Sequence, residues 1–255
     1  MQVWKIITHS VRQVFGNFGP AVRISAVLYV VLWATVLVLD AAFGANLPVS
    51  GAGDAAEMTA MKVLFGPALL SIVVLLLADI WIAVAWHRYV LKGEHSPGWL
   101  PVFQGRRMLG YFGAMIAMFL VFGLLVAGTL LVASLATRLI GNGALLSVVP
   151  AVFLVLAGGL MLRLSTVLAG FALEPGHRLI EGWEATRGQS LGFFLLALIV
   201  GVAINLVQAV TVALLSGTPL LFIAVSFLVQ WVVTMVGISI LTTLYGHFIQ
   251  KRALV

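Results

Sequence analysis

The chain lacks cysteine entirely and has few charged residues, which make up 9% of its 255 positions. Without cysteine it can form neither disulfide bonds nor thiolate metal sites. A soluble domain usually carries about 25% charged residues. Since this chain is 62% hydrophobic, it has too few polar groups to cover a surface that faces water. We therefore expect a lipid bilayer to be its solvent.

Common nucleotide-binding and metal-binding sequence motifs are also missing. The chain contains no P-loop, no G-x-G-x-x-G and no H-E-x-x-H string, and no two histidines have the spacing that places two metal ligands on one helix face. The string Gly188 to Gly192 does match G-x-S-x-G around Ser190. That motif requires a strand before the serine, whereas here an amphipathic segment precedes it and an apolar run follows. We predict no enzyme activity, no cofactor and no metal ion.

What the chain does contain is long apolar runs. A helix of about 20 residues spans the roughly 30 Å hydrocarbon core of a bilayer. The clearest run, Pro67 to Trp86, holds a single charge, Asp79, and is followed at once by His87 and Arg88. We predict an all-α protein with six transmembrane helices over Val22–Ala42, Pro67–Trp86, Leu109–Ala136, Ala144–Leu162 (with helix continuing to Leu173), Leu191–Leu215 and Leu220–Gly246.

Two further segments are amphipathic. Residues 2–18 place apolar side chains at helical spacing with basic and polar residues largely between them, which predicts a helix in the headgroup layer. Packing of this helix on a partner protein is the alternative. Residues 174–188 show a similar pattern around Leu179 and Trp183.

The basic residues predict the orientation. Of the fourteen Lys and Arg residues, all but Lys62 and Arg138 fall on one side of the predicted membrane. Because the cytoplasmic side carries the excess of Lys and Arg, we predict a bacterial inner-membrane protein with both termini cytoplasmic. The net charge of +6 then reflects this topology and not a nucleic-acid partner.

A faint internal repeat divides the single membrane domain into units of about 1–93, 94–173 and 174–255. In each unit an interfacial amphipathic segment is followed by a glycine-containing break and then by two spans. Since each unit holds two spans, the three repeats are parallel, unlike the inverted repeats of many transporters.

The connector from Glu174 to Gly188 and the segment Trp86 to Glu94 resemble parts of known membrane proteins. They are similar to the YciC-like inner-membrane proteins of bacteria and to the membrane domain that precedes some glycerophosphodiester phosphodiesterases. This resemblance implies a six-span bundle with interfacial helices and supplies no catalytic residues. The chain has no soluble phosphodiesterase domain, so that activity is not expected of it.

Polar residues inside the spans form one candidate site. A carboxylate deep in a span is costly and tends to face the interior of the bundle. Three amides lie at a similar predicted depth to Asp79, so a polar cluster is expected. It is either a proton or ligand site or a hydrogen-bonded packing feature. Its members are Asp79, Asn205, Gln208 and Gln230.

Basic residues at the cytoplasmic interface form a second candidate site. Basic pockets between helices on this side bind lipid phosphates, although such charges are also needed simply for orientation, and Arg163 could snorkel to the interface. The candidates for lipid-phosphate binding are Arg23, His87, Arg88, Arg106, Arg107 and Arg163.

These features together predict an accessory or scaffold protein. Its partners would be anionic lipids of the cytoplasmic leaflet, and a membrane-protein complex or a second copy of the chain is possible. The alternative is a transporter of a small solute or lipid that uses the cluster around Asp79. A membrane-embedded enzyme acting on lipid headgroups is the third hypothesis.

Overall fold

The computed structural model describes residues 2–43, 54–141 and 145–254, and these residues form helices and connections without a β-strand. The predicted all-α class is therefore confirmed. The helices are α1 Val3–Phe15, α2 Phe18–Phe43, α3 Asp54–Lys92, α4 Gly105–Ile140, α5 Leu145–Ser165, α6 Leu168–Leu173, α7 Leu179–Ala185, α8 Ser190–Leu215 and α9 Pro219–Leu244, followed by a π-helix over Tyr245–Ile249.

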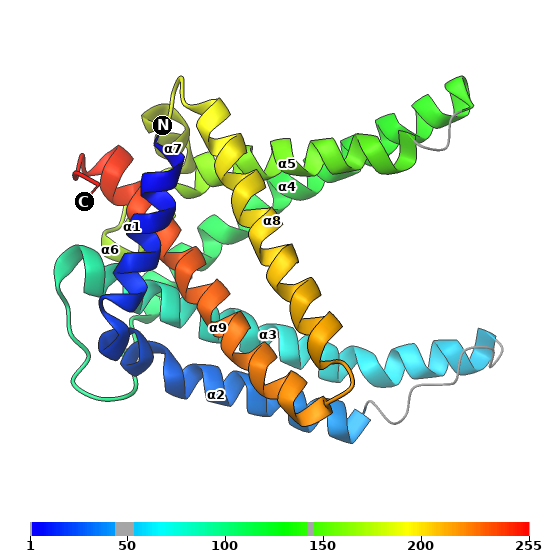
Figure 1. The fold of residues 1–255 in the computed structure, drawn as a ribbon, viewed down its shortest axis with the longest axis horizontal. Coiled ribbons are helices and arrows are strands. Elements are labelled where there is room, and N and C mark those ends of the chain that lie inside the picture. Colours follow the sequence, from blue (N-terminus) through cyan, green and yellow to red (C-terminus); the bar gives the residue numbers. More distant parts are fainter. Residues whose placement is uncertain (1, 44–53, 142–144, 255) are drawn as a thin grey trace.

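Within the described residues, six helical segments are long and apolar enough to cross a membrane, as predicted. The chain is thus a multi-pass membrane protein built from the helix pairs α2/α3, α4/α5 and α8/α9 (Figure 1). With 39 and 36 residues, α3 and α4 are longer than the roughly 20 residues that span a bilayer core. Their ends must therefore reach the headgroup layers or tilt within the membrane.

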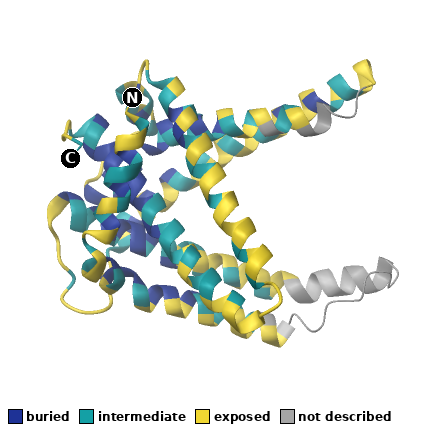
Figure 2. Ribbon diagram, in the orientation of Figure 1, coloured by how far each residue is buried: buried dark blue, intermediate teal, exposed yellow. Residues whose placement is uncertain are grey.

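The tightly packed part of the molecule is one end of the bundle. Both termini lie at this end, and the α2/α3 and α4/α5 pairs extend away from it as separate arms (Figure 1). Figure 2 shows most buried residues at this end and mostly exposed or half-buried residues along the arms. Exposed apolar side chains are expected there, because lipid tails are as apolar as leucine and do not drive helices together. We call the packed end the basic end, since the connectors around Arg88, Arg107 and Arg187 lie there with both termini.

The fourth span differs from its prediction. A continuous helix was expected to Leu173, but α5 ends at Ser165 and α6 begins at Leu168. The hydroxyls of Ser165 and Thr166 both donate to the carbonyl oxygen of Leu162, at 3.0 Å each. Such back-bonding competes with the backbone ladder and bends helices, so the break occurs without a proline.

The helices can be compared with the predicted repeat units. A short helix precedes the first and third helix pairs, α1 and α7 respectively, but residues 93–104 before the second pair contain no helix. Pro97 and Pro101 account for this difference, because each fixes its own φ and disfavours helix at the preceding residue. The threefold repeat remains a prediction.

Candidate functional site

The basic end contains a buried polar network that joins α3, α4 and α9. Trp86 and His87 are fully buried, and the Trp86 indole donates to Ser239 Oγ at 2.8 Å. His87 Nδ1 lies 2.8 Å from Thr242 Oγ1, and its Nε2 lies 3.3 Å from the Tyr111 hydroxyl. Two neighbouring residues of α3 therefore bind three groups on two other helices.

The partners of His87 determine where its ring proton lies. The Thr242 hydroxyl donates to the carbonyl oxygen of Ile238 at 2.9 Å, so its oxygen accepts from His87 Nδ1. Nε2 then accepts from Tyr111. His87, predicted as a lipid-phosphate contact, is thus placed inside the bundle with both nitrogens in use.

Arg88 and Lys92 hold the C-terminal end of α6. Arg88 Nη1 donates to the carbonyl oxygens of Ala172 and Leu173 at 2.9 and 3.3 Å, while Nε and Nη2 bind the Glu94 carboxylate at 2.7 and 2.5 Å. Lys92 Nζ also donates to Leu173 O, at 3.3 Å. Cations at a helix C-terminus satisfy its free carbonyls and its dipole. The predicted phosphate ligand Arg88 thus serves an internal contact.

Arg163 connects α5 to α7 and α8. Only 4% of the residue is exposed, and its guanidinium carbon lies 3.7 Å from the centre of the Trp183 ring. Its three nitrogens donate to Thr186 Oγ1 at 3.0 Å, Ser190 Oγ at 2.9 Å and Trp183 O at 3.1 Å. Among the described residues no carboxylate forms an ion pair with it. Each of the three guanidinium nitrogens thus has a neutral acceptor, and the face of the Trp183 ring lies against the group.

Ser190, the serine of the G-x-S-x-G string, is one of the three groups that bind the Arg163 guanidinium. It is the first residue of α8, and its hydroxyl oxygen accepts a hydrogen bond from Arg163 Nη1. No strand precedes it, because residues 186–189 form a turn after α7. The strand–turn–helix context that this motif requires is therefore absent here.

The other three basic candidates have free side chains. Arg23 and Arg106 are exposed and Arg107 is half-buried. Across the part of the chain that the structure describes, none of the three takes part in a hydrogen bond through its side chain or in an ion pair. They remain available to an outside anion, unlike the three candidates described above.

The predicted polar cluster is divided by the structure. Gln208 of α8 and Gln230 of α9 line one hollow of about 210 Å³ with Trp33 of α2. Asn205 is exposed and donates to Gly201 O of its own helix at 2.8 Å. Asp79 is half-buried on α3. Within the described residues no hydrogen bond joins Asp79 to any of the three amides.

The outer side of α1 exposes both apolar and basic residues at this end. Ile6, Ser10 and Val14 are fully buried, and Ser10 Oγ donates to Thr243 Oγ1 of α9 at 2.9 Å. The predicted amphipathic helix therefore packs on the protein's own last span. Its exposed residues, with the start of α2, form what we call the α1 patch: Trp4, Lys5, Arg12, Phe15, Phe18 and Arg23.

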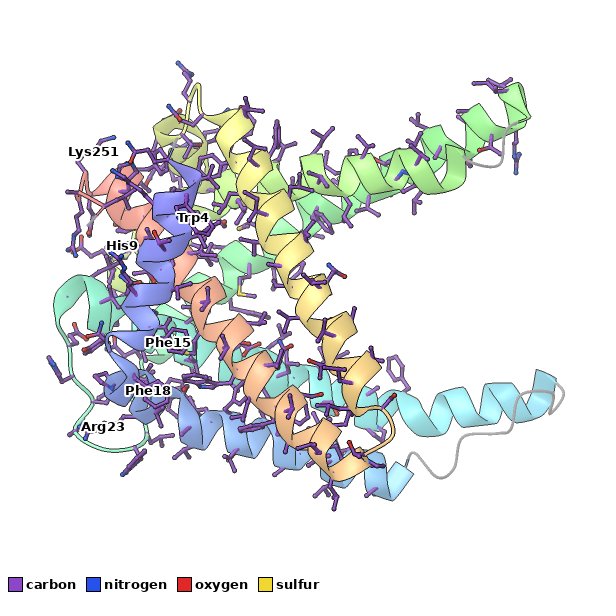
Figure 3. The ribbon with its side chains drawn as sticks, in the orientation of Figure 1. Trp4, His9, Phe15, Phe18, Arg23 and Lys251 are labelled. Carbon is purple, nitrogen blue, oxygen red and sulfur yellow. The ribbon has the colours of Figure 1, made fainter. Side chains whose placement is uncertain are left out.

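The aromatic and basic residues of the α1 patch lie on adjacent sides of α1. Trp4 and Phe15 are 70% and 49% exposed and lie 11 positions apart, which at about 100° per residue places them on one side of the helix. Lys5 and Arg12 follow next around the helix. Figure 3 shows Trp4 and Phe15 toward the spanning helices, with His9 and Lys251 on the other side.

Sequence reasoning missed a second hydrogen-bonded chain. His177 Nδ1 lies 2.8 Å from Glu181 Oε2, and its Nε2 lies 3.4 Å from the hydroxyl of Tyr245 in the π-helix. The i, i+4 spacing of His177 and Glu181 was a visible signal for the first contact. Nothing in the sequence places Tyr245 beside them, since it is 68 positions away.

The polar partners of Trp86 and His87 were also missed, although a signal existed. Ser239, Thr242 and Thr243 form a polar stripe at i, i+3 and i+4 in an otherwise apolar span. A stripe of this kind indicates a face that hydrogen-bonds to another helix.

The described residues hold no group of three or more His, Cys, Asp or Glu side chains that could bind a metal ion. The chain matches no protein-family model, and comparisons with curated proteins and with solved structures find no similar protein.

Proposed function

We propose that the chain is a non-enzymatic accessory or scaffold protein of the bacterial inner membrane, with both termini cytoplasmic. It contacts anionic lipids of the cytoplasmic leaflet through the α1 patch. The observation that carries this proposal is the exposure of Trp4 and Phe15 beside Lys5 and Arg12 on a helix that is anchored to the bundle by its opposite face.

The arrangement suits the boundary between lipid and water. Aromatic rings prefer the headgroup level, and basic residues close to an anionic surface contribute about 1 kcal/mol each. In Figure 1 α1 runs across the end of α2 and α3 and not along them. This direction would place α1 in the plane of the membrane surface, with its aromatic side toward the acyl chains.

The buried polar groups support a structural role. The side chains of Trp86, His87 and Arg163 form hydrogen bonds to other parts of the same chain. Such networks rigidify a bundle. The resemblance to YciC-like membrane proteins supports the same proposal, since it implies a bundle with interfacial helices.

The test places an environment-sensitive fluorophore on the full-length chain in vesicles of phosphatidylcholine with about one third phosphatidylglycerol. The chain has no cysteine, so Trp4→Cys and Phe15→Cys each create a single labelling position. Glu184→Cys, on the exposed side of α7, is the control. Lipids that carry a quencher at headgroup depth should quench positions 4 and 15 strongly and position 184 weakly.

Equal quenching at the three positions would overturn the proposal. Strong protection of positions 4 and 15 from both lipid and water would also overturn it. That result would assign the α1 patch to a protein partner or to a second copy of the chain. Cross-linking through the same cysteines would then show which of the two it is.

A transporter is the alternative function, and one observation favours it. Asp79 is a half-buried carboxylate inside the membrane-spanning part of α3, and ionisable residues at such positions often mark ion or substrate pathways. Asp79→Asn should then abolish movement of a proton or substrate in vesicles while the protein still inserts. Transport that is unchanged in this variant would remove the alternative.

A further inference from the structure

The structure leaves most of α8 exposed. All of its residues are described, and among them only Phe193 and Leu196, in the first two turns, are buried. Figure 2 shows the later turns of this helix as exposed or half-buried. Lipid tails can cover such a surface wherever it is apolar. A polar side chain on the same surface requires a different partner.

One such side chain lies deep in the predicted membrane. Asn205 is exposed and lies 15 positions after Ser190 and 10 before Leu215, or about 22 and 15 Å from the two ends of α8 at 1.5 Å per residue. Its Nδ2 donates to Gly201 O at 2.8 Å, and within the described residues the side chain has no other hydrogen bond. An amide has two N–H donors and one carbonyl acceptor. The carbonyl oxygen and one N–H therefore lack a partner at a depth where an unpaired polar group is costly.

The other two amides of the predicted polar cluster are placed differently. Gln208 and Gln230 line the hollow beside Trp33, between α2, α8 and α9. Asn205 is not a lining residue of this hollow. It therefore lies on a side of α8 that faces either lipid or another molecule.

Asn205 belongs to a regular line of exposed residues along α8. Successive members are alternately four and three positions apart, which is the heptad spacing of helices that pack side by side. At about 100° per residue the five positions fall within about 80° of one another around the helix. The line is about 21 Å long at 1.5 Å per residue. We call it the α8 seam: Leu198, Val202, Asn205, Ala209 and Val212.

The partner that fits this seam is a second copy of the chain. Two copies insert into the membrane with the same orientation, so Asn205 of one copy lies at the same depth as Asn205 of the other. An amide both donates and accepts hydrogen bonds, so it can pair with its own copy across a two-fold axis, as an interface between identical surfaces requires. A single Asn in a heptad seam also fixes the register of the paired helices.

We propose that the chain forms a symmetric dimer in the membrane through the α8 seam. The two copies of α8 are parallel, and their Asn205 amides form hydrogen bonds to each other. This inference goes beyond the proposed function, since it uses neither the α1 patch nor a lipid headgroup.

Disulfide cross-linking of the full chain in vesicles tests the seam, because the chain has no cysteine of its own. Val202→Cys and Ala209→Cys lie on the seam. Ala203→Cys and Val210→Cys are the matched controls, because each is exposed, lies one position further along and points to another side of α8. With the chain highly diluted in lipid and mildly oxidised, positions 202 and 209 should form a covalent dimer about tenfold faster than positions 203 and 210, since a disulfide requires Cβ atoms about 3.5–4.5 Å apart.

A second variant tests the amide itself. Asn205→Leu should weaken association about tenfold, because it removes a hydrogen bond between two membrane helices. Energy transfer between copies labelled at Ala253→Cys, followed as the lipid dilution increases, measures this association. Gln208→Leu removes an amide that lines the hollow and should leave the association unchanged. The melting temperature of the monomer in detergent should be the same in Asn205→Leu and the wild type, because the one hydrogen bond of this side chain is to its own helix.

Equal cross-linking at all four positions would overturn the proposal, since random collisions favour no side of α8. Association that is unchanged in Asn205→Leu would also overturn it. Cross-linking of positions 202 and 209 to a different protein in native membranes, without a covalent dimer, would assign the seam to that protein and would be a third contradiction. The fluorophores at positions 4 and 15 report separately on the α1 patch, so failure here and failure of the proposed function are distinguishable.

Discussion

Arg163 and Arg106 are both arginines at the boundary of a span, yet their environments differ completely. Arg163 is 4% exposed and donates through all three nitrogens to α7 and α8. Arg106 is exposed and free of such contacts in the described chain. Both arginines have a similar position relative to a span. The presence of hydrogen-bond acceptors around the guanidinium group therefore determines which arginine stabilises the fold and which is open to a ligand.

Substitution of Arg163 by lysine tests its structural role. Lysine keeps the charge but has neither the planar fork nor the aromatic stacking of arginine. We expect the free energy of unfolding in detergent to fall by about 2 kcal/mol, because hydrogen bonds to a charged group contribute about 1.5–3 kcal/mol each and only some of them can be remade. Thermal unfolding followed by tryptophan fluorescence provides the measurement.

Arg138→Lys is the control for this substitution. Arg138 is exposed in the last turn of α4, and surface substitutions usually change stability by no more than about 0.5 kcal/mol. Equal stability of Arg163→Lys, Arg138→Lys and the wild type would show that the contacts of Arg163 contribute little.

At the scale of elements, the position of α7 depends on one glycine. A Cβ at Gly182 would lie 2.8 Å from the carbonyl oxygens of Arg163 and Leu164 in α5. Both atoms are backbone, so they cannot move aside as a flexible side chain would. Gly182 therefore permits the close approach that brings Trp183 and Thr186 to Arg163.

Two Gly→Ala substitutions should have opposite effects. Gly182→Ala should destabilise the protein by about 1–3 kcal/mol, the usual result of overpacking. Gly237→Ala in α9 meets nothing within 4 Å and should stabilise by up to about 1 kcal/mol through its higher helix propensity. Melting temperatures of the two variants in one detergent provide the comparison. A shift of the same sign in both would contradict the packing of α7 on α5.

The elements were predicted to different degrees by the sequence. The six spans follow from uninterrupted apolar runs, since hydropathy is a local property, and the structure confirms them. The burial of α1 on α9 could not be predicted, because it depends on Ser10 meeting Thr243 across 233 positions. The break before α6 was also missed, because the hydroxyls of Ser165 and Thr166 can either bend a helix or leave it straight.

The candidate site shows the same limit. Counting along helices gave Asp79, Asn205 and Gln208 a common depth but not a common direction, and the structure leaves Asn205 exposed and bonded to its own helix. Depth follows from 1.5 Å per residue, whereas the side of a helix that faces the bundle depends on how the neighbouring helices pack.

At the scale of the whole molecule, an even number of spans requires both termini to lie on the same side of the membrane. The position of the termini agrees with this requirement. Both termini lie at the basic end (Figure 1), and the turn between α8 and α9 lies at the far end of these helices. The excess of Lys and Arg predicts that the basic end faces the cytoplasm. This orientation underlies the proposed lipid contact of the α1 patch, because the anionic surface potential belongs to the cytoplasmic leaflet.

Single cysteines test this orientation directly, since the chain has none of its own. Gln2→Cys, Ala253→Cys and Ser216→Cys each alter an exposed residue. In inside-out vesicles a maleimide that cannot cross the membrane should label positions 2 and 253 but not 216, and in right-side-out vesicles it should label only 216. Labelling of 2 and 253 from opposite sides would require an odd number of crossings. Labelling of both from outside would invert the molecule and place Arg106, Arg107 and the α1 patch at the periplasmic leaflet, where no cytoplasmic anionic lipid could reach them.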